Sequence, residues 1–166
     1  YNTEFENVVS GSDDGFIAVW DIENGRQLTK FGDAHGKNNK LTAGTFDSTQ
    51  RRMVSAGSDG TVKIWNFSNG SSLKNLLGAS TKELQKQVDK EVTALLCVYD
   101  PTPGDVEKPS FFVAAGWDKR LRIWPDDRTS DEENVRASRD LPNRYLANNA
   151  TQKTHGDDIM SATYDF

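Results

Sequence analysis

One local pattern occurs three times along the chain and constrains the fold more than any other feature. An aspartate in a short polar turn precedes a tryptophan by six residues in "SGSDDGFIAVWD" (10–21), "SAGSDGTVKIWN" (55–66) and "AAGWDKRLRIWP" (114–125). Val, Ile and Trp fit a pleated, half-buried surface, while Gly and Asp suit the tight turn between two strands. Each copy is therefore predicted to be a β-hairpin.

The spacing of the three hairpins extends this prediction to the whole chain. Their tryptophans, Trp20, Trp65 and Trp124, are 45 and 59 residues apart. Further strand-like segments flank the hairpins, at 25–32, 40–47, 71–78, 91–100 and 158–166. Four short strands per unit, repeated about every 40–45 residues, are typical of the blades of a β-propeller. The predicted fold class is all-β, with a partial ring of about three and a half four-stranded blades.

The repeats resemble those of the WD-repeat family, and the stretch "AHGKNNKLTAGTFDSTQRRMVSAGSDGTVKIWN" (34–66) carries the resemblance almost throughout. At about 40–45 residues per blade the chain is too short for a closed ring, so it is expected to be a segment of a longer protein. The resemblance divides it into a partial blade over 1–33, a complete blade over 34–78, a helical insertion over 79–90, a blade over 91–154 with a long polar insertion at 126–154, and the first strand of a further blade over 155–166.

The same resemblance implies a buried hydrogen-bonded tetrad in each blade, built from a loop His, a Ser on the second strand, the turn Asp and the Trp. Such a network must be complete to stiffen the blade. The third blade has Ala114 in place of the Ser and no His before Glu91, so it should be less rigid or held by its neighbours. The matching residues are His35, Ser55, Asp59 and Trp65 in the second blade, Ser10, Asp14 and Trp20 in the first, whose His is expected before Tyr1, and Asp118 and Trp124 in the third.

These polar residues also have a chemical interpretation. His35 and His155 are the only histidines and could act as a general base or as metal ligands, and Asp14, Asp59 and Asp118 could be catalytic carboxylates. Their identical places in three repeats favour blade architecture, because active sites are normally asymmetric. The sequence has no cluster of His, no nucleophile beside a base and no phosphate-binding loop at the start of a helix. The protein is therefore predicted not to be an enzyme and not to use a cofactor or a metal.

Candidate partner-binding residues come from the rim of the expected blades. The resemblance implies that the residue before each turn Asp is exposed and often contacts partners, and these residues are Asp13, Ser58 and Trp117. Lys119 and Arg120 adjoin Trp117, and Trp and Arg are enriched at interface hot spots. The alternative is that Trp117 packs against an adjacent loop of its own chain.

Charge and composition limit the classes of partner. The net charge is −5, from 20 basic and 25 acidic residues, which is a poor footprint for nucleic-acid binding. The basic cluster Lys119, Arg120 and Arg122 could contact a phosphate or an acidic partner, or it could be the solvated rim of a hairpin. No apolar run is long enough to span a membrane and no signal-peptide pattern starts the chain. The single cysteine, Cys97, is expected to be buried, and an intracellular location is expected, which is the cytoplasm unless a narrower assignment applies.

Two insertions interrupt the repeat. In "STKELQKQVDKE" (80–91), Ser80 and Glu83 have the spacing of a capping box, which predicts a short helix. The polar insertion that begins at 126 must contain the outermost strand of the third blade, which is expected near 143–147. A third segment, "PTPGDVEKPS" (101–110), is too rich in proline to join a sheet interior.

A narrower resemblance is to WD-repeat proteins of cilia and flagella. Its marks are Thr45-Phe46-Asp47 followed by Arg51-Arg52, the run 116–120 (Gly-Trp-Asp-Lys-Arg), and His-x-x-Asp-Ile at 155–159. Members carry two propellers and are structural components of the axonemal doublet microtubules, so this resemblance implies a scaffold that docks other proteins in a large assembly. The alternative is a propeller that serves as a substrate receptor or adaptor, as in ubiquitin ligases or chromatin readers.

Overall fold

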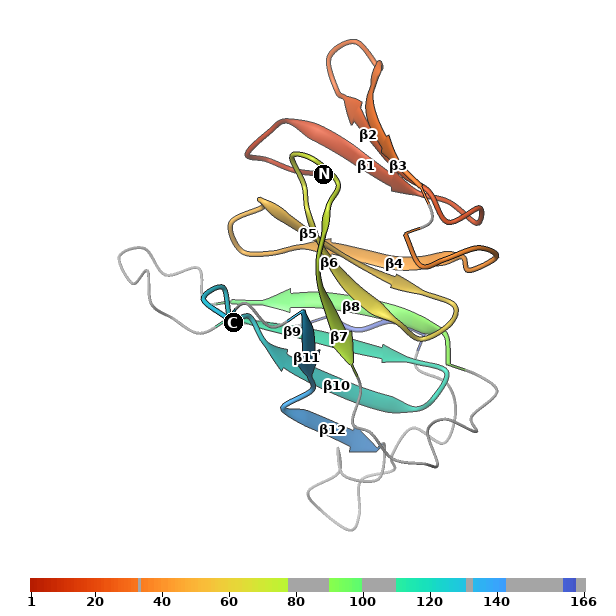
Figure 1. Cartoon of the computed structure of the whole chain (residues 1–166), viewed down its shortest axis with the longest axis vertical. Coiled ribbons are helices and arrows are strands. Elements are labelled where there is room, and N and C mark those ends of the chain that lie inside the picture. The colour runs from red at the N-terminus through yellow and green to blue at the C-terminus, as the bar shows by residue number, and fades with distance from the viewer. Residues whose placement is uncertain (33, 78–89, 100–109, 131–132, 143–159, 164–166) are drawn as a thin grey trace.

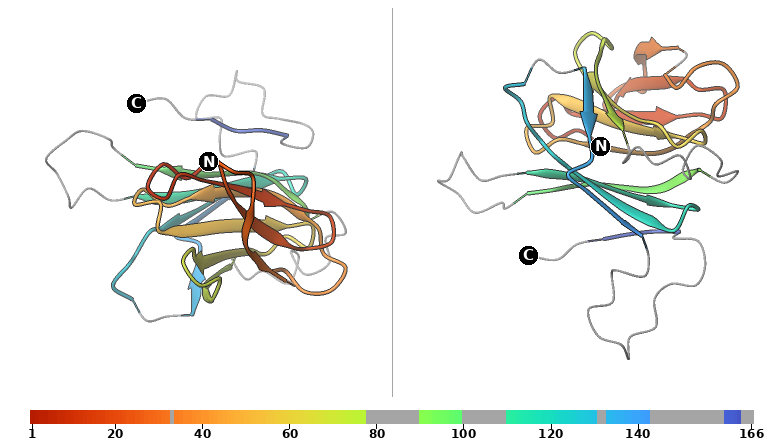
Figure 2. Two further views of the ribbon diagram at one scale, coloured as in Figure 1. Left: turned by 90° about the horizontal axis from the view of Figure 1, so that it is seen from above. Right: turned by 60° about the horizontal axis from the view of Figure 1, so that its bottom comes forward.

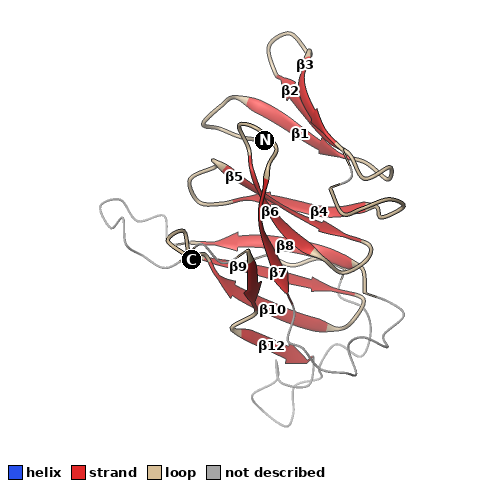
Figure 3. Ribbon diagram, viewed as in Figure 1, coloured by secondary structure: helices blue, strands red, loops and turns tan. Residues whose placement is uncertain are grey.

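The computed structural model describes residues 1–32, 34–77, 90–99, 110–130, 133–142 and 160–163. In this part of the chain twelve strands form three sheets, and no segment is helical. The sheets follow one another down the molecule in sequence order, from the N-terminal sheet at the top of Figure 1 to the third sheet below. Figure 3 shows the same arrangement with every strand in red. The all-β prediction of a partial propeller is confirmed.

The first sheet has the order β1-β2-β3 and is antiparallel throughout. Alternation along β2 directs Ile17 and Val19 into the interior, where both are buried beside Phe31 of β3. The Asn24–Gly25 turn between β2 and β3 is possible because Gly25 has a φ of 68°. The strands are β1 (Asn7–Gly11), β2 (Ile17–Asp21) and β3 (Gln27–Phe31).

The second sheet repeats this plan with an added strand on each side. A β-bulge between Ile64 and Trp65 corresponds to the bulge between Val19 and Trp20 in the first sheet. The fifth strand, β11, comes from the polar insertion and pairs in parallel with β7, which the sequence analysis did not foresee. The strands are β4 (Leu41–Phe46), β5 (Arg52–Gly57), β6 (Val62–Asn66), β7 (Ser72–Leu77) and β11 (Asn134–Arg136).

The third sheet corrects one prediction. Its outermost strand is β12 (Arg139–Pro142), not a strand near 143–147, a range that lies outside the described residues. The pairing begins at Ser138, whose backbone N–H and hydroxyl both donate to the carbonyl of Ile123, at 2.9 and 3.0 Å. A strand of only four residues, positioned by a contact of this kind, is too short to show a hydrophobic periodicity in the sequence. The other strands are β8 (Val92–Val98), β9 (Phe111–Gly116) and β10 (Arg120–Pro125).

Two predicted elements are largely beyond the described residues. Only residues 90 and 91 of the expected 80–91 helix are described, and neither is helical. Of the expected first strand of a further blade, residues 160–163 are described, and they belong to none of the three sheets. Ala162 packs against Ala94 and Ala115 of the third sheet. The assignment of 155–166 to a further blade therefore stays a prediction.

The hydrophobic core lies between neighbouring sheets, which pack face to face (Figure 2). Trp124 and Phe112 of the third sheet are completely buried against residues of the second sheet. Cys97 belongs to this layer, and burial raises the pKa of its thiol to about 12, which makes it an unreactive core residue. The residues of this layer from the second sheet are Val54, Ala56, Val62, Ile64 and Leu76.

A cluster of buried charges joins the second and third sheets. The Nη2 atom of Arg52 lies 3.0 Å from Asp47 Oδ2 and 2.6 Å from Asp126 Oδ1, and both carboxylates are fully buried. Arg128 Nη2 lies 3.3 Å from Asp126 Oδ2 and completes a neutral set of two cations and two anions. Burial acts to raise the pKa of Asp47, but hydrogen bonds from Thr49 and Arg52 hold it below its ordinary value.

Replacing Arg52 with alanine is expected to lower the free energy of unfolding of the full-length protein by about 3 kcal/mol, because two buried carboxylates lose a shared cation. Urea unfolding measures this loss. Arg51→Ala is the matched control, since Arg51 is exposed and its change should stay within about 0.5 kcal/mol. Equal losses in the two variants would show that the cluster does not hold the sheets together.

Candidate functional site

The three hairpin turns lie along one rim of the molecule, at the right-hand side of Figure 1. Ser58 N–H donates to the carbonyl of Lys40, and Trp117 N–H donates in the same way to the carbonyl of Glu91, each at 3.0 Å. Each of these turns is therefore fixed to the residue that precedes the innermost strand of its own sheet. The second and third turns of the rim are thus held by the same backbone contact.

The turn aspartates share one local role in all three repeats. The Oδ1 atom of Asp59 accepts the N–H of Thr61 at 3.0 Å, and Oδ1 of Asp118 accepts the N–H of Arg120 at 3.2 Å. In the first repeat the corresponding distance, from Asp14 Oδ1 to the nitrogen of Phe16, is 3.4 Å. Asp recurs because its carboxylate satisfies a backbone donor that the turn leaves free.

In the second blade, four predicted residues are arranged around one hydrogen-bonded chain. Trp65 Nε1 donates to Ser55 Oγ at 2.8 Å, and Ser55 Oγ lies 2.8 Å from His35 Nε2. On the other side of the ring, His35 Nδ1 lies 2.5 Å from Thr61 Oγ1, which donates to Asp59 Oδ1 at 2.8 Å. A neutral imidazole that carries its proton on Nδ1 satisfies every donor and acceptor in this chain.

Thr61 is a member of this chain that sequence reasoning missed. The direct separation of His35 Nδ1 and Asp59 Oδ1 is 4.0 Å, too long for a hydrogen bond, so the threonine hydroxyl connects them. The available signal was a hydroxyl residue two positions after the turn Asp. Phe16 and Arg120 occupy that position in the other repeats.

The charge state of His35 follows from its surroundings. The residue is only 4% exposed, and this burial lowers the pKa of its imidazole to about 4, with Asp59 acting in the opposite direction and Lys63 adding to the fall. His35 is therefore uncharged at neutral pH. It acts there as a bridge between Ser55 and Thr61.

The first blade has only part of this arrangement. Trp20 Nε1 donates to Ser10 Oγ at 2.8 Å, as in the second blade. Asp14 is not brought to these two residues, because its carboxylate accepts the hydroxyl of Ser12 and the N–H of Phe16. The hydrogen bond from Ser12 is also what lowers the pKa of Asp14.

The third blade uses a different solution. Ala114 and Trp124 are completely buried, and the Nη2 atom of Arg122 donates to Asp118 Oδ2 in a buried ion pair. Arg122 stands where the second repeat has Lys63, on the same face of its strand as Trp124. The sequence analysis considered a solvated or partner-binding role for Arg122, and the structure instead places its guanidinium inside the blade.

The rim candidates differ in their surroundings. Asp13 and Ser58 meet around Lys40, whose Nζ lies 2.7 Å from Asp13 Oδ2 and whose N–H donates to Ser58 Oγ at 3.1 Å. Trp117 is half-buried, and its indole Nε1 is buried with no hydrogen-bond acceptor in the described part of the chain. Lys119 has a φ of 59° at a turn position where the first and second repeats have glycine.

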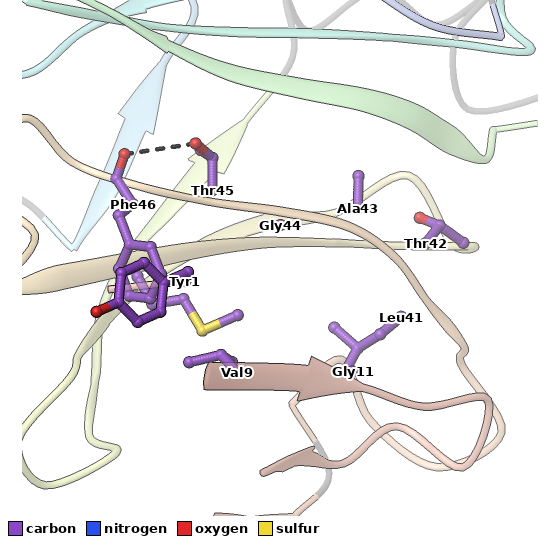
Figure 4. Close-up of a pocket in the computed structure, with 10 residues that line it drawn as sticks. Tyr1, Val9, Gly11, Leu41, Thr42, Ala43, Gly44, Thr45 and Phe46 are labelled. Atoms are coloured by element: carbon purple, nitrogen blue, oxygen red, sulfur yellow. Dashed lines mark hydrogen bonds between the residues drawn. The ribbon is translucent and has the colours of Figure 1, made fainter. Parts of the chain in front are cut away.

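A groove of about 490 Å³ lies between β1 of the first sheet and β4 of the second (Figure 4). Its walls are formed by residues such as Val9, Leu41 and Met53, with Tyr1 at one end. Among the described residues that line the groove, Tyr1 has the one titratable side chain. Within the described ranges, no three His, Cys, Asp or Glu side chains are placed to hold a metal, and no helix is long and apolar enough to cross a membrane.

Comparison with known families and structures agrees with this geometry. The WD40 family (WD domain, G-beta repeat) matches residues 2–21 and 25–66. No curated protein matches the sequence. The WD repeat is typical of protein-interaction scaffolds, and no enzyme family is found.

Solved structures extend the likeness to the whole chain. The crystal structure of the RRP9 WD40 repeats superposes with a TM-score of 0.67 at 15% identity, over 96% of this chain and 39% of that one. The computationally designed Ika4 protein gives a TM-score of 0.59 at 23% identity, over 97% of this chain and 75% of that one. The chain therefore spans about two fifths of the RRP9 structure, and the likeness shows the fold alone, that of a partial β-propeller.

The depressed pKa of His35 makes stability depend on pH. Between pH 6.5 and about 4 the unfolded chain takes up a proton that the folded chain refuses, so stability falls as the pH falls through this window, by about 3 kcal/mol in total. Urea unfolding between pH 7 and pH 4 should show this loss of stability. The His35→Gln variant lacks the titrating imidazole, so its loss over the same pH range should be smaller by the contribution of His35. Parallel pH profiles for the two proteins would contradict a buried neutral His35.

A mutant cycle tests whether Thr61 connects His35 to Asp59. His35→Ala and Asp59→Ala should each cost about 1–3 kcal/mol, because each leaves buried polar partners unpaired. Together they should cost at least about 0.5 kcal/mol less than the sum. In a Thr61→Val background this coupling should disappear. A coupling that survives the loss of the hydroxyl would mean that the two residues interact by another route.

Proposed function

We propose that this protein is a non-enzymatic scaffold that binds other proteins through the rim formed by its hairpin turns. WD repeats imply a protein-interaction scaffold. A rigid blade supports this use of the rim, because loops on a fixed framework hold a binding surface in shape without further ordering cost. The partners are proteins, and the proposal includes no nucleic acid, membrane or cofactor.

The observation that carries the proposal is the state of Trp117. The side chain is only partly exposed at the rim, while its indole N–H is buried and has no acceptor among the described residues. A buried donor left unpaired costs about 1–3 kcal/mol. A partner that packs on the exposed part of the ring and shifts the turn, so that an acceptor reaches the N–H, would remove this cost on binding. Lys119 and Arg120 extend the same surface. Lys119 has a positive φ, which suits glycine better, and yet this turn position carries a charged side chain.

A finer proposal concerns the assembly. The resemblance of residues 45–52, 116–120 and 155–159 to ciliary and flagellar WD-repeat proteins supports a structural role on the axonemal doublet microtubules, and hence a location in the cilium or flagellum. The structure gives two of these marks a physical role, since Asp47 and Arg52 join the sheets and Trp117 lies on the rim. Co-purification with tubulin and dynein-linked proteins would support the axoneme. Co-purification with ubiquitin-ligase subunits or histones would support the receptor or adaptor role instead.

Trp117→Ala in the full-length protein should abolish recovery of the principal partner from native extracts, with melting temperature unchanged. Trp117→Phe keeps an aromatic ring, although a smaller one, and removes the donor, so it should weaken binding of the partner without destabilising the protein. Tyr99→Ala is the matched control, because Tyr99 is a partly exposed aromatic at the other end of the third sheet. If Trp117→Ala lowers melting by several degrees and keeps the partner, Trp117 is a packing residue.

A further inference from the structure

The outer edges of the first and second sheets are equivalent positions. Phe31 pairs with Ile17 as Leu76 pairs with Val62, and the same bulge precedes both outer strands. Asn-Gly turns with a glycine φ of 68° lead into both strands. Yet β7 is covered by β11, whereas β3 pairs only with β2 in the described part of the chain.

The way β11 covers β7 shows what this edge accepts. Asn75 N–H donates to the carbonyl of Glu133 at 2.6 Å, and Asn75 Nδ2 donates to Asn134 Oδ1 at 3.2 Å. Val135 pairs with the buried Leu76 and packs against the core, while Asn134 stays exposed. The occupant is thus a short parallel strand with an apolar residue facing inward and a polar residue facing outward.

The β3 edge has the same backbone but different side chains. By register, Lys30 stands at the place of Asn75 and Phe31 at the place of Leu76. Phe31 is buried and lies so close to Gly70 that a Cβ there would be 2.3 Å from its ring, which fixes this end of β3. Leu28 is 54% exposed, and Arg26 is exposed beside it. The edge therefore combines open backbone groups, exposed apolar surface and positive charge.

We propose that the outer edge of β3 binds an extended, acidic segment of a partner protein, which adds a parallel strand to the first sheet as β11 does to the second. An apolar residue of this segment pairs with Phe31, and an acidic residue takes the place of Asn134 opposite Lys30. Added strands gain affinity from main-chain hydrogen bonds and specificity from alternate side chains. This surface is separate from the rim, so the two binding activities can fail independently.

Charge favours such a partner over a second copy of this chain. Lys30 Nζ lies 3.7 Å from the centre of the Phe16 ring, which holds the cation beside the edge. Two copies of β3 paired edge to edge would bring Lys30 and Arg26 against each other, and like charges opposite one another destabilise a sheet. A strand with acidic residues at these positions gains attraction instead.

The test uses the full-length protein and a fluorescein-labelled probe peptide, Ser-Glu-Glu-Val-Glu-Ser, followed by fluorescence anisotropy. Lys30→Glu should weaken binding of this probe about fivefold or more. A second probe, with Lys in place of each Glu, should bind the Lys30→Glu variant more tightly than it binds the wild-type protein. Lys37→Glu is the matched control, since it makes the same charge change at an exposed rim lysine and should alter binding less than twofold. A probe N-methylated at its valine should not bind, because strand pairing is blocked.

Amide hydrogen exchange separates strand addition from simple charge attraction. The N–H of Lys30, which corresponds to the bonded N–H of Asn75, should exchange freely in the unbound protein and slow down when the probe binds. Equal binding of the N-methylated probe, or equal binding by Lys30→Glu, would overturn the proposal. So would a Lys30 amide already protected in the unbound full-length protein, because the edge would then be covered by the protein's own chain.

Discussion

The pairing of buried polar groups beneath the rim is the constraint on which the rest of the structure depends. In the second blade, the chain from Trp65 through Ser55, His35 and Thr61 to Asp59 ties two strands, a turn and a loop into one unit. Each of these groups would be costly to bury alone, so the turn can hold its place only while the chain is complete. The rim is rigid because its turns are anchored from below, and a rigid rim can present side chains to a partner at little entropic cost.

The other two blades show that the constraint can be met in different ways. The first keeps the indole–hydroxyl bond between Trp20 and Ser10, and its turn Asp serves only the turn itself. The third exchanges the histidine bridge for the buried pair of Arg122 and Asp118. Loss of tetrad residues is thus compensated within the third blade, and the second blade lends further support through the cluster that contains Arg52 and through β11.

The features that could be predicted from sequence are local ones. The hairpins follow from turn residues between strand-forming residues, and the repeat of Asp and Trp gives the propeller. The missed features depend on contacts that the pattern of residue types does not reveal. Neither the three residues of β11 nor the four of β12 carry a recognisable period. β11 is placed by β7, a strand far away in sequence, and β12 by β10 of the preceding hairpin. Thr61 and Arg122 look like ordinary strand residues, and only the fold shows which buried carboxylate each one meets.

The central claim is that the rim around Trp117 faces another protein. Lysine-directed cross-linking of the native assembly, followed by mass spectrometry, tests it most directly, because Lys119 lies two residues from Trp117 and Lys40 contacts Asp13 and Ser58 of the same rim. The account predicts that Lys119 forms cross-links to a second protein and that Lys40 reaches the same partner. Cross-links from Lys119 confined to its own chain, with intermolecular links coming only from lysines such as Lys30 on the outer edge of β3, would contradict it.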